Sequence, residues 1–240
     1  MAPPHLLLLP GLACDADVWQ DQIRAFSEIT TVSVTDYGLS DSIEKMAMVA
    51  LDGAPERFAV AGHSMGGRVA FEIVRRAPER VAGLAVLDTA YRAFAGGEAG
   101  ERETATRFAL LDVARTKGMR AMSRFWMKGI IHPDRVADKE LTDAILDMMG
   151  RKTPEIFAAQ IKALLERPDA TPVLSTIRCP AMVLVGRQDA WSSIAGHREI
   201  AALIPNAKFE VIEHCGHMSP MERPAEVTAA MSAWFEGLKG

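Results

Sequence analysis

Cysteine is scarce in this chain, and the spacing of its cysteines and histidines does not mark a metal site. The 240 residues include three cysteines, and no Cys-x-x-Cys spacing occurs. This usage is typical of a reduced protein without a disulfide framework. Neither a His-Glu-x-x-His motif nor a Gly-x-Gly-x-x-Gly motif is present. We therefore expect no metal and no nicotinamide or flavin cofactor.

Long hydrophobic runs and an excess of positive charge are also lacking. The apolar run Leu6–Leu9 is far too short for a membrane span or the core of a signal peptide, and no basic residue precedes it. The formal net charge is −4, which argues against nucleic acid as a partner. We expect a cytoplasmic monomer or dimer that binds neither nucleic acid nor a membrane.

What the sequence does contain is an alternation of short apolar runs and helix-like stretches. The apolar runs cover residues 5–9, 31–34, 57–61, 84–87, 181–185 and 209–212, and the helical stretches 18–26, 42–51, 65–77, 194–204 and 224–238. Most runs are continuously apolar, as in strands buried on both faces. The pattern predicts an α/β fold: a mostly parallel sheet with helices on both faces.

One long segment, residues 91–175, interrupts this alternation. It contains no convincing strand, and glycine or proline breaks divide it into four or five short helical stretches. We interpret residues 91–175 as a helical cap inserted into a core domain made of residues 1–90 and 176–240. A chain of 240 residues is long enough for one domain with such an insertion.

A nucleophile motif lies at the end of the third apolar run. Residues Gly62–Gly66 read Gly-His-Ser-Met-Gly, which fits Gly-x-Ser-x-Gly. An apolar run ends just before the motif and a periodic helix begins at Met65, so the motif occupies a strand–turn–helix junction. There the serine sits on a sharp bend that exposes its hydroxyl. The pattern predicts Ser64 as a nucleophile and the Met65 N–H as a donor to a bound carbonyl oxygen.

A serine hydroxyl needs a base, and His217 is the favoured candidate. It follows the last predicted strand and precedes the last helix. The loops at the carboxyl ends of parallel strands are where such sheets hold functional groups. His214 is the local competitor. His63, which adjoins Ser64, is interpreted as a packing or hydrogen-bonding residue.

The base needs an acid to orient it, and two aspartates compete for that role. Asp189 closely follows the predicted strand 181–185, and Asp88 follows the strand 84–87. The order Ser64, Asp189, His217 is the chain order of a nucleophile-elbow hydrolase, so Asp189 is favoured.

A second oxyanion donor should come from the loop after the first strand. Pro10 has no N–H, Gly11 lets the backbone approach a ligand, and Leu12 offers its N–H. We therefore predict the Leu12 and Met65 amides as the oxyanion hole.

Four apolar side chains are candidates for the substrate pocket. Trp126 and Met122 belong to an apolar cluster of the cap, for which a role in the cap's own core is the alternative. Trp19 and Trp191 lie just past the predicted functional loops. Several cap arginines, Arg120 among them, could attract a carboxylate or a carrier protein, although a solvated helix face is the favoured interpretation.

Taken together, these segments resemble the α/β-hydrolase superfamily, and within it the small cap-bearing hydrolases related to pimeloyl-carrier-protein methyl esterase and to the menaquinone-pathway cyclohexadiene carboxylate synthase. The resemblance is carried by Leu7–Asp15 with Trp19, Gly62–Gly67, Gly186–Asp189, and Gly216–His217 followed by Pro224. It implies Ser64 as nucleophile, His217 as base, Asp189 as acid, and Leu12 and Met65 as oxyanion donors.

The expected function is hydrolysis of an ester or thioester of a small or medium carboxylic acid, with the acid possibly carried on a carrier protein. The reaction would proceed through an acyl-enzyme on Ser64. Two alternatives stay open: a lyase or carbon–carbon bond hydrolase that uses the same residues, and a non-catalytic ligand-binding protein on this scaffold.

Overall fold

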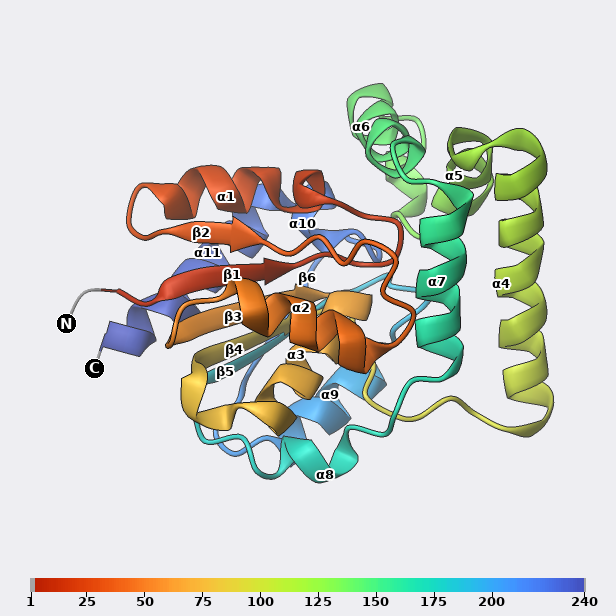
Figure 1. Cartoon of the computed structure of the whole chain (residues 1–240). Helices are drawn as coiled ribbons and strands as arrows, with labels where there is room; N and C mark the ends of the chain where they lie inside the picture. The colour runs from red at the N-terminus through yellow and green to blue at the C-terminus, as the bar shows by residue number, and fades with distance from the viewer. Residues whose placement is uncertain (1–2, 240) are drawn as a thin grey trace.

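A computed structural model describes residues 3–239, and its centre is a sheet of six parallel strands (Figure 1). The strand order is β2-β1-β3-β4-β5-β6, and every pairing is parallel. The strands are β1 (His5–Leu9), β2 (Val32–Val34), β3 (Phe58–His63), β4 (Val81–Leu87), β5 (Ala181–Gly186) and β6 (Lys208–Ile212). The predicted parallel sheet is confirmed.

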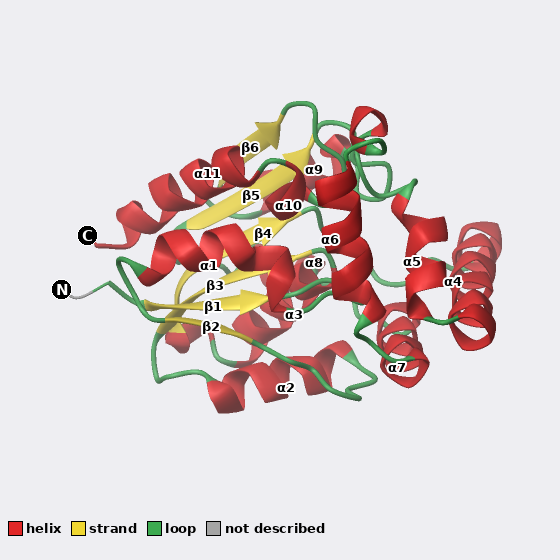
Figure 2. Ribbon diagram, turned by 90° about the horizontal axis from the view of Figure 1, so that it is seen from above, coloured by secondary structure: helices red, strands yellow, loops and turns green. Residues whose placement is uncertain are grey.

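Helices cover both faces of the sheet (Figures 1 and 2). One face carries α1 (Gln20–Ser27) and α11 (Pro224–Glu236); the other carries α2 (Ile43–Gly53), α3 (Met65–Arg76) and α9 (Ile194–Leu203). Shorter elements are η1 (Ala16–Trp19), η2 (Pro78–Arg80), η3 (Pro133–Arg135), α10 (Ser219–Glu222) and η4 (Gly237–Lys239). The central strands are buried between the two helical layers, which explains their continuously apolar sequences.

Two central strands are longer than their apolar runs predict. β3 continues through Gly62 and His63 because these residues pair with Val86 and Leu87 of β4. β4 begins at Val81, before the predicted start. Glycine is a weak strand former by itself, so tertiary pairing extends the strand up to the turn at Ser64.

Beyond the carboxyl ends of the strands lie four cap helices (Figure 1). They are α4 (Gly97–Lys117), α5 (Met119–Met127), α6 (Lys139–Gly150) and α7 (Pro154–Leu165). The expectation of short helices throughout was wrong for α4, which runs for 21 residues until Gly118, at φ 84°, ends it. The short α8 (Thr171–Leu174) packs against α3 and α9 beside the sheet. The division into core and cap remains a prediction.

Charged and polar bonds tie these cap helices to the loops at the edge of the sheet. The Gln160 side chain of α7 accepts a 2.8 Å hydrogen bond from the backbone N–H of Ala13. Arg151, just after α6, pairs with Asp15 and with Asp17. Because these bonds reach the loop after β1, they hold α6 and α7 over the carboxyl end of the sheet.

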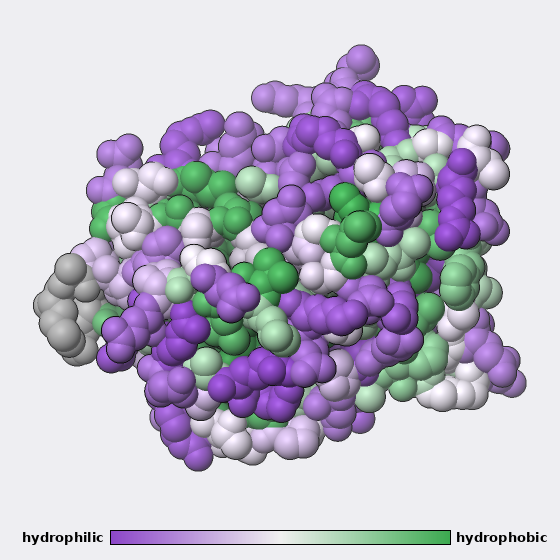
Figure 3. All heavy atoms as spheres, viewed as in Figure 1, coloured by the Kyte–Doolittle hydropathy of each residue, from purple (hydrophilic) through white to green (hydrophobic). Residues whose placement is uncertain are grey.

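The outer surface is mixed in character. In the view of Figure 3, hydrophobic side chains form small groups separated by hydrophilic ones. Large exposed apolar side chains include Leu39 and Phe125, which are 67% and 70% exposed. Within residues 3–239, no helix combines the length and apolar character needed to cross a membrane.

Candidate functional site

Ser64 occupies the turn between β3 and α3 and has an unusual backbone conformation. Its φ of 53° and ψ of −114° lie outside the regions that non-glycine residues favour. The Ser64 N–H donates a 2.8 Å bond to the carbonyl of Leu87 on β4. A Cβ on Gly66 would come within 2.1 Å of the Leu9 carbonyl oxygen, so only glycine fits there. Close packing of strand and helix thus fixes the sharp bend.

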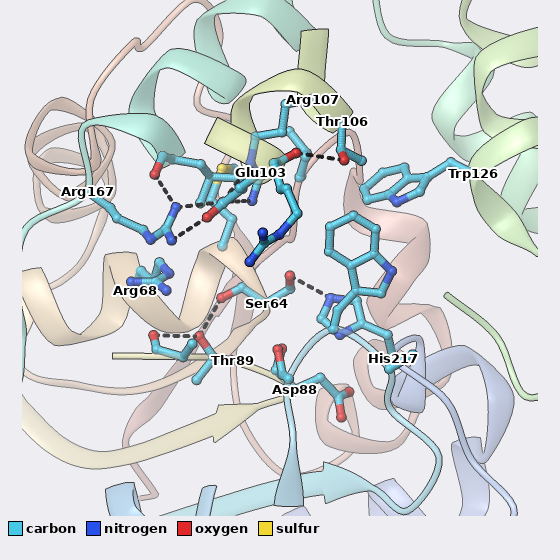
Figure 4. Close-up of a pocket in the computed structure, with 18 residues that line it drawn as sticks. Ser64, Arg68, Asp88, Thr89, Glu103, Thr106, Arg107, Trp126, Arg167 and His217 are labelled. Carbon is cyan, nitrogen blue, oxygen red and sulfur yellow. Dashed lines mark hydrogen bonds and ion pairs between the residues drawn. The ribbon is translucent and has the colours of Figure 1, made fainter. Parts of the chain in front are cut away.

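The structure brings Ser64, His217 and Asp189 together from three separate strand ends (Figure 4 shows the first two). His217 Nε2 lies 2.8 Å from Ser64 Oγ, and His217 Nδ1 lies 2.8 Å from Asp189 Oδ2. The other oxygen of Asp189 accepts bonds from the N–H groups of Trp191 and Ser192, at 2.8 and 2.9 Å. These bonds hold the carboxylate so that one oxygen faces the imidazole.

Burial and charge oppose each other in this group. Burial by itself lowers the pKa of His217, but the Asp189 carboxylate outweighs it and raises that pKa above the ordinary value. Burial correspondingly raises the pKa of Asp189, and the His217 imidazole outweighs it, so the carboxyl titrates below its ordinary value. An ionised Asp189 beside a histidine that titrates above its usual range is suited to proton transfer near neutral pH.

The competing residues take other positions. Asp88 accepts bonds from the N–H groups of Gly186 and Ser219, and lies 3.7 Å from the His63 ring rather than against His217. Burial, and then the nearby Asp189, raise the pKa of Asp88 to about 8. Asp88 therefore joins the end of β5 to the start of α10.

The two histidines that were weighed against His217, His214 and His63, differ in burial. His214 is exposed. His63 is buried, and its Nε2 lies 2.7 Å from the His217 carbonyl oxygen. Burial, and then His217, lower the pKa of His63 to about 3, so the ring is neutral and its Nε2–H donates to that carbonyl. His63 supports the His217 backbone, as the hydrogen-bonding interpretation of this residue predicts.

A cavity of about 390 Å³ opens beside Ser64, between the sheet and the cap. Its wall includes His217, Leu12, Met65, Trp126 and Trp191. Its size is within the usual range for small-molecule sites.

Two of the predicted pocket residues do not line this cavity. Trp19 is fully buried and packs edge-on against His63, with ring centroids 6.3 Å apart. Met122 is fully buried on α5, which packs between α4 and α6, so it belongs to the interior of the cap. The sequence pattern identified both as apolar but not which apolar interior each one joins.

The loop after β1 closely approaches the nucleophile. A Cβ on Gly11 would lie 2.9 Å from His63 Nδ1 and 3.2 Å from the Ser64 Cβ. Glycine at this position therefore lets the following residue, Leu12, reach the cavity beside Met65.

Five charged residues of the cavity wall were not predicted from the sequence: Arg68, Arg102, Glu103, Arg107 and Arg167. Of these residues, Arg68 could have been predicted from the sequence. It lies one helical turn after Ser64 and therefore on the same side of α3. The cap arginine Arg120, singled out from the sequence, instead pairs with Asp147 away from this wall.

A second buried carboxyl group, Glu222 of α10, supports the His217 loop. It is 1% exposed and accepts backbone N–H bonds from His132 at 2.7 Å, Gly216 at 3.0 Å and Met218 at 3.1 Å. One side chain therefore joins the loop on either side of His217 to the cap segment before η3.

We expect Glu222→Ala to lower the free energy of unfolding by about 3–5 kcal/mol, because three buried N–H groups lose their acceptor. Urea unfolding followed by circular dichroism would measure the change. Glu222→Gln keeps one acceptor oxygen, so its free energy of unfolding should fall distinctly less than that of Glu222→Ala. Equal stability of Glu222→Ala and the parent protein would refute this role.

Within residues 3–239, no group of three or more His, Cys, Asp or Glu side chains is arranged to hold a metal ion. The polar side chains that line the cavity include Ser64, His217, the buried Asp88, the hydroxyl residues Thr89, Thr106 and Ser192, and the arginines and the glutamate of the wall.

Known proteins resemble this chain over most of its length. The model of the alpha/beta hydrolase family matches residues 6–230. A pimeloyl-[acyl-carrier protein] methyl ester esterase of Nitrosomonas europaea is 23% identical, with 96% of this chain and 95% of that protein covered. An (E)-2-((N-methylformamido)methylene)succinate hydrolase of Acinetobacter baylyi is 27% identical, with 96% and 90% covered. Among solved structures, a malate-bound esterase of Thermogutta terrifontis superposes with a TM-score of 0.85 at 28% identity, covering 98% and 90% of the two chains.

Proposed function

The chain belongs to the alpha/beta hydrolase family, and from that premise we propose that it is a serine hydrolase that cleaves an ester or thioester of a small or medium carboxylic acid. The observation that carries the proposal is the chain of two 2.8 Å contacts from Ser64 Oγ through His217 to Asp189. These are the contacts that an activated serine requires. The relatives named as esterases and hydrolases support the same class.

In the proposed first step, His217 Nε2 takes the proton of Ser64 as Oγ attacks the substrate carbonyl carbon. Asp189 accepts the Nδ1–H of His217 and so keeps Nε2 free as the acceptor. The resulting imidazolium then gives its proton to the departing alcohol or thiol. Bond formation to Ser64 and loss of the leaving group yield an acyl-enzyme.

In the second step, a water molecule gives a proton to His217 and attacks the acyl carbon. The bond from the acyl carbon to Ser64 Oγ then breaks and Oγ takes the proton back from His217, which releases the acid and restores the Ser64 hydroxyl. Both steps pass through an oxyanion. We assign its stabilisation to the N–H groups of Leu12 and Met65, whose residues line the cavity beside Ser64. Loss of one such donor typically costs about 3–4 kcal/mol of transition-state stabilisation.

The substrate would lie between the sheet and the cap, where Trp126 and Trp191 provide apolar wall. We assign residues 91–175 the role of a specificity cap over the core formed by 1–90 and 176–240. The relatives named as pimeloyl-[acyl-carrier protein] methyl ester esterases support a carrier-bound acid as one form of the substrate.

Covalent labelling tests the proposed function. A fluorophosphonate should add one adduct, and peptide mass spectrometry should locate it on Ser64. Rapid quenching with a p-nitrophenyl ester should trap an acyl group at the same residue. Labelling without any ester turnover would instead favour a lyase, a carbon–carbon bond hydrolase or a binding protein.

The pH dependence should report His217. The neutral imidazole is the base, so kcat/KM for an uncharged ester should rise with pH and level off above the pKa of His217. Because Asp189 raises that pKa, we expect the midpoint above the ordinary value of 6.5. A stopped-flow or pH-stat profile of kcat/KM would locate it.

Two variants check whether this rise of kcat/KM with pH is due to His217. His217→Ala should remove the rise together with most of the activity. His214→Ala should keep the rate and the midpoint of the parent enzyme, because His214 is exposed. The reverse outcome would identify the wrong histidine as base.

A further inference from the structure

Three arginines and one glutamate form a cluster in the wall of the cavity beside Ser64 (Figure 4). A fourth arginine of the wall, Arg102, is paired with Glu98. Arg68 comes from α3, Glu103 and Arg107 from α4, and Arg167 from the segment after α7. Glu103 accepts bonds from Arg107 at 2.7 and 2.8 Å and two bonds of 2.7 Å from Arg167. A single carboxylate therefore serves two guanidinium groups, and the third arginine is left over.

Arg68 is the cation without an anion. Its Nη1 donates a 2.9 Å bond to the carbonyl of Arg92, and within residues 3–239 no carboxylate forms an ion pair with it. Burial, and then the positive charge of Arg167, lower the pKa of Arg68 to about 9, so it is still charged at neutral pH. Asp88 also borders the cavity, but its oxygens already accept two backbone N–H groups. The wall therefore has a net positive charge.

The unsatisfied polar atoms of the same wall are hydrogen-bond donors. Arg167 Nε and Trp126 Nε1 are buried, and neither has a hydrogen-bond partner. Buried donors without acceptors are costly, and native proteins satisfy most of them. The wall thus has donors and positive charge in excess of acceptors, and a ligand that brings negatively charged oxygen atoms would neutralise the excess charge of Arg68.

We propose that this arginine wall binds a free carboxylate of the substrate, with Arg68 as its principal ligand. The inference rests on the proposed function and narrows it to esters in which the acid half or the alcohol half bears a second, ionised carboxyl group. A planar guanidinium matches a carboxylate with two parallel hydrogen bonds. Arg68 lies one helical turn after Ser64 on α3, and both residues line the same cavity. A carboxylate bound there would hold the ester carbonyl against the nucleophile.

Matched pairs of esters test the inference. Monomethyl glutarate and methyl valerate have the same acyl chain length and differ in the free carboxylate on the acid half. O-acetyl glycolate and ethyl acetate differ in a carboxylate on the alcohol half. For at least one pair, we expect kcat/KM of the anionic ester to exceed that of the neutral ester; which pair responds identifies the half that carries the carboxylate.

Variants at Arg68 then test whether this residue causes the preference for anionic esters. Arg68→Met should lower the ratio of anionic to neutral kcat/KM by about 30- to 100-fold, the usual size of a lost hydrogen bond to a charged group. Arg68→Lys keeps the positive charge but not the planar guanidinium, so this ratio should fall by less than in Arg68→Met. Arg124→Met removes an equal charge from an exposed position on α5 and should leave the ratio unchanged.

Binding of glutarate gives a readout independent of turnover. Glutarate should raise the melting temperature of the parent protein and of Arg124→Met, but not of Arg68→Met. Equal turnover of both members of each pair, or an anion preference that survives in Arg68→Met, would overturn the inference while ester hydrolysis stands. Arg68-dependent glutarate binding without ester turnover or labelling of Ser64 would overturn the proposed function and leave the carboxylate site.

Discussion

Ser64→Ala should abolish ester hydrolysis, with a fall in kcat of at least about 10⁴-fold, because removal of the nucleophile of such a group leaves only binding and oxyanion stabilisation. The fold should survive, since among residues 3–239 the Ser64 hydroxyl bonds only to His217, and the turn is held by backbone contacts. Initial rates with a p-nitrophenyl ester, measured at high enzyme concentration, would give the residual activity.

Ser27→Ala is the matched control, because Ser27 is an exposed serine at the end of α1. It should hydrolyse the ester at the parent rate. Melting temperatures of both variants should lie close to that of the parent protein. Wild-type activity in Ser64→Ala would remove the basis of the proposed mechanism.

Asp189→Asn should lower kcat by about 10²- to 10⁴-fold without loss of the fold. The asparagine oxygen can still accept the N–H groups of Trp191 and Ser192. Its amide NH₂ then faces His217 Nδ1, which favours the imidazole form with the proton on Nε2. In that form Nε2 cannot accept the proton of Ser64.

Asp88→Asn is the comparison that separates the two aspartates. Because Asp88 bonds to the amides of Gly186 and Ser219 and not to His217, we expect the kcat of this variant to fall by less than about tenfold, which is less than about 1.4 kcal/mol. Steady-state kinetics of both variants on one ester would decide. If Asp88→Asn is the more damaging change, Asp88 and not Asp189 is the acid.

The sheet could be read from the sequence because its signal is local. Runs such as Leu6–Leu9 are apolar on both strand faces, and only a strand between two helical layers buries both. Ser64, Asp189 and His217 were identified in the same way: each lies where a parallel strand ends, and parallel strands all end at one edge of a sheet. Topology then brings them within hydrogen-bond reach although up to 153 residues separate them.

The cap was less predictable, because helical periodicity shows that a face is apolar but not what covers it. Met122 and Trp126 lie on the same helix, yet Met122 joins the cap interior and Trp126 borders the cavity. Likewise, Arg120 and Arg68 are equivalent as sequence letters. Arg120 pairs with Asp147 at the surface, whereas Arg68 lines the same cavity as Ser64.

The sequence by itself determined the parallel sheet, the nucleophile turn and the identity of the residues that meet at its edge, because each depends on neighbours within a few positions along the chain. Only the tertiary structure decided which side chains form the cavity and which carboxylates neutralise which arginines. Those contacts depend on how α4 and the segment after α7 cross the end of the sheet, where Glu103 meets Arg107 and Arg167 and leaves Arg68 without an anion. Charge balance in a buried wall is set by distances between distant segments, which no local pattern records.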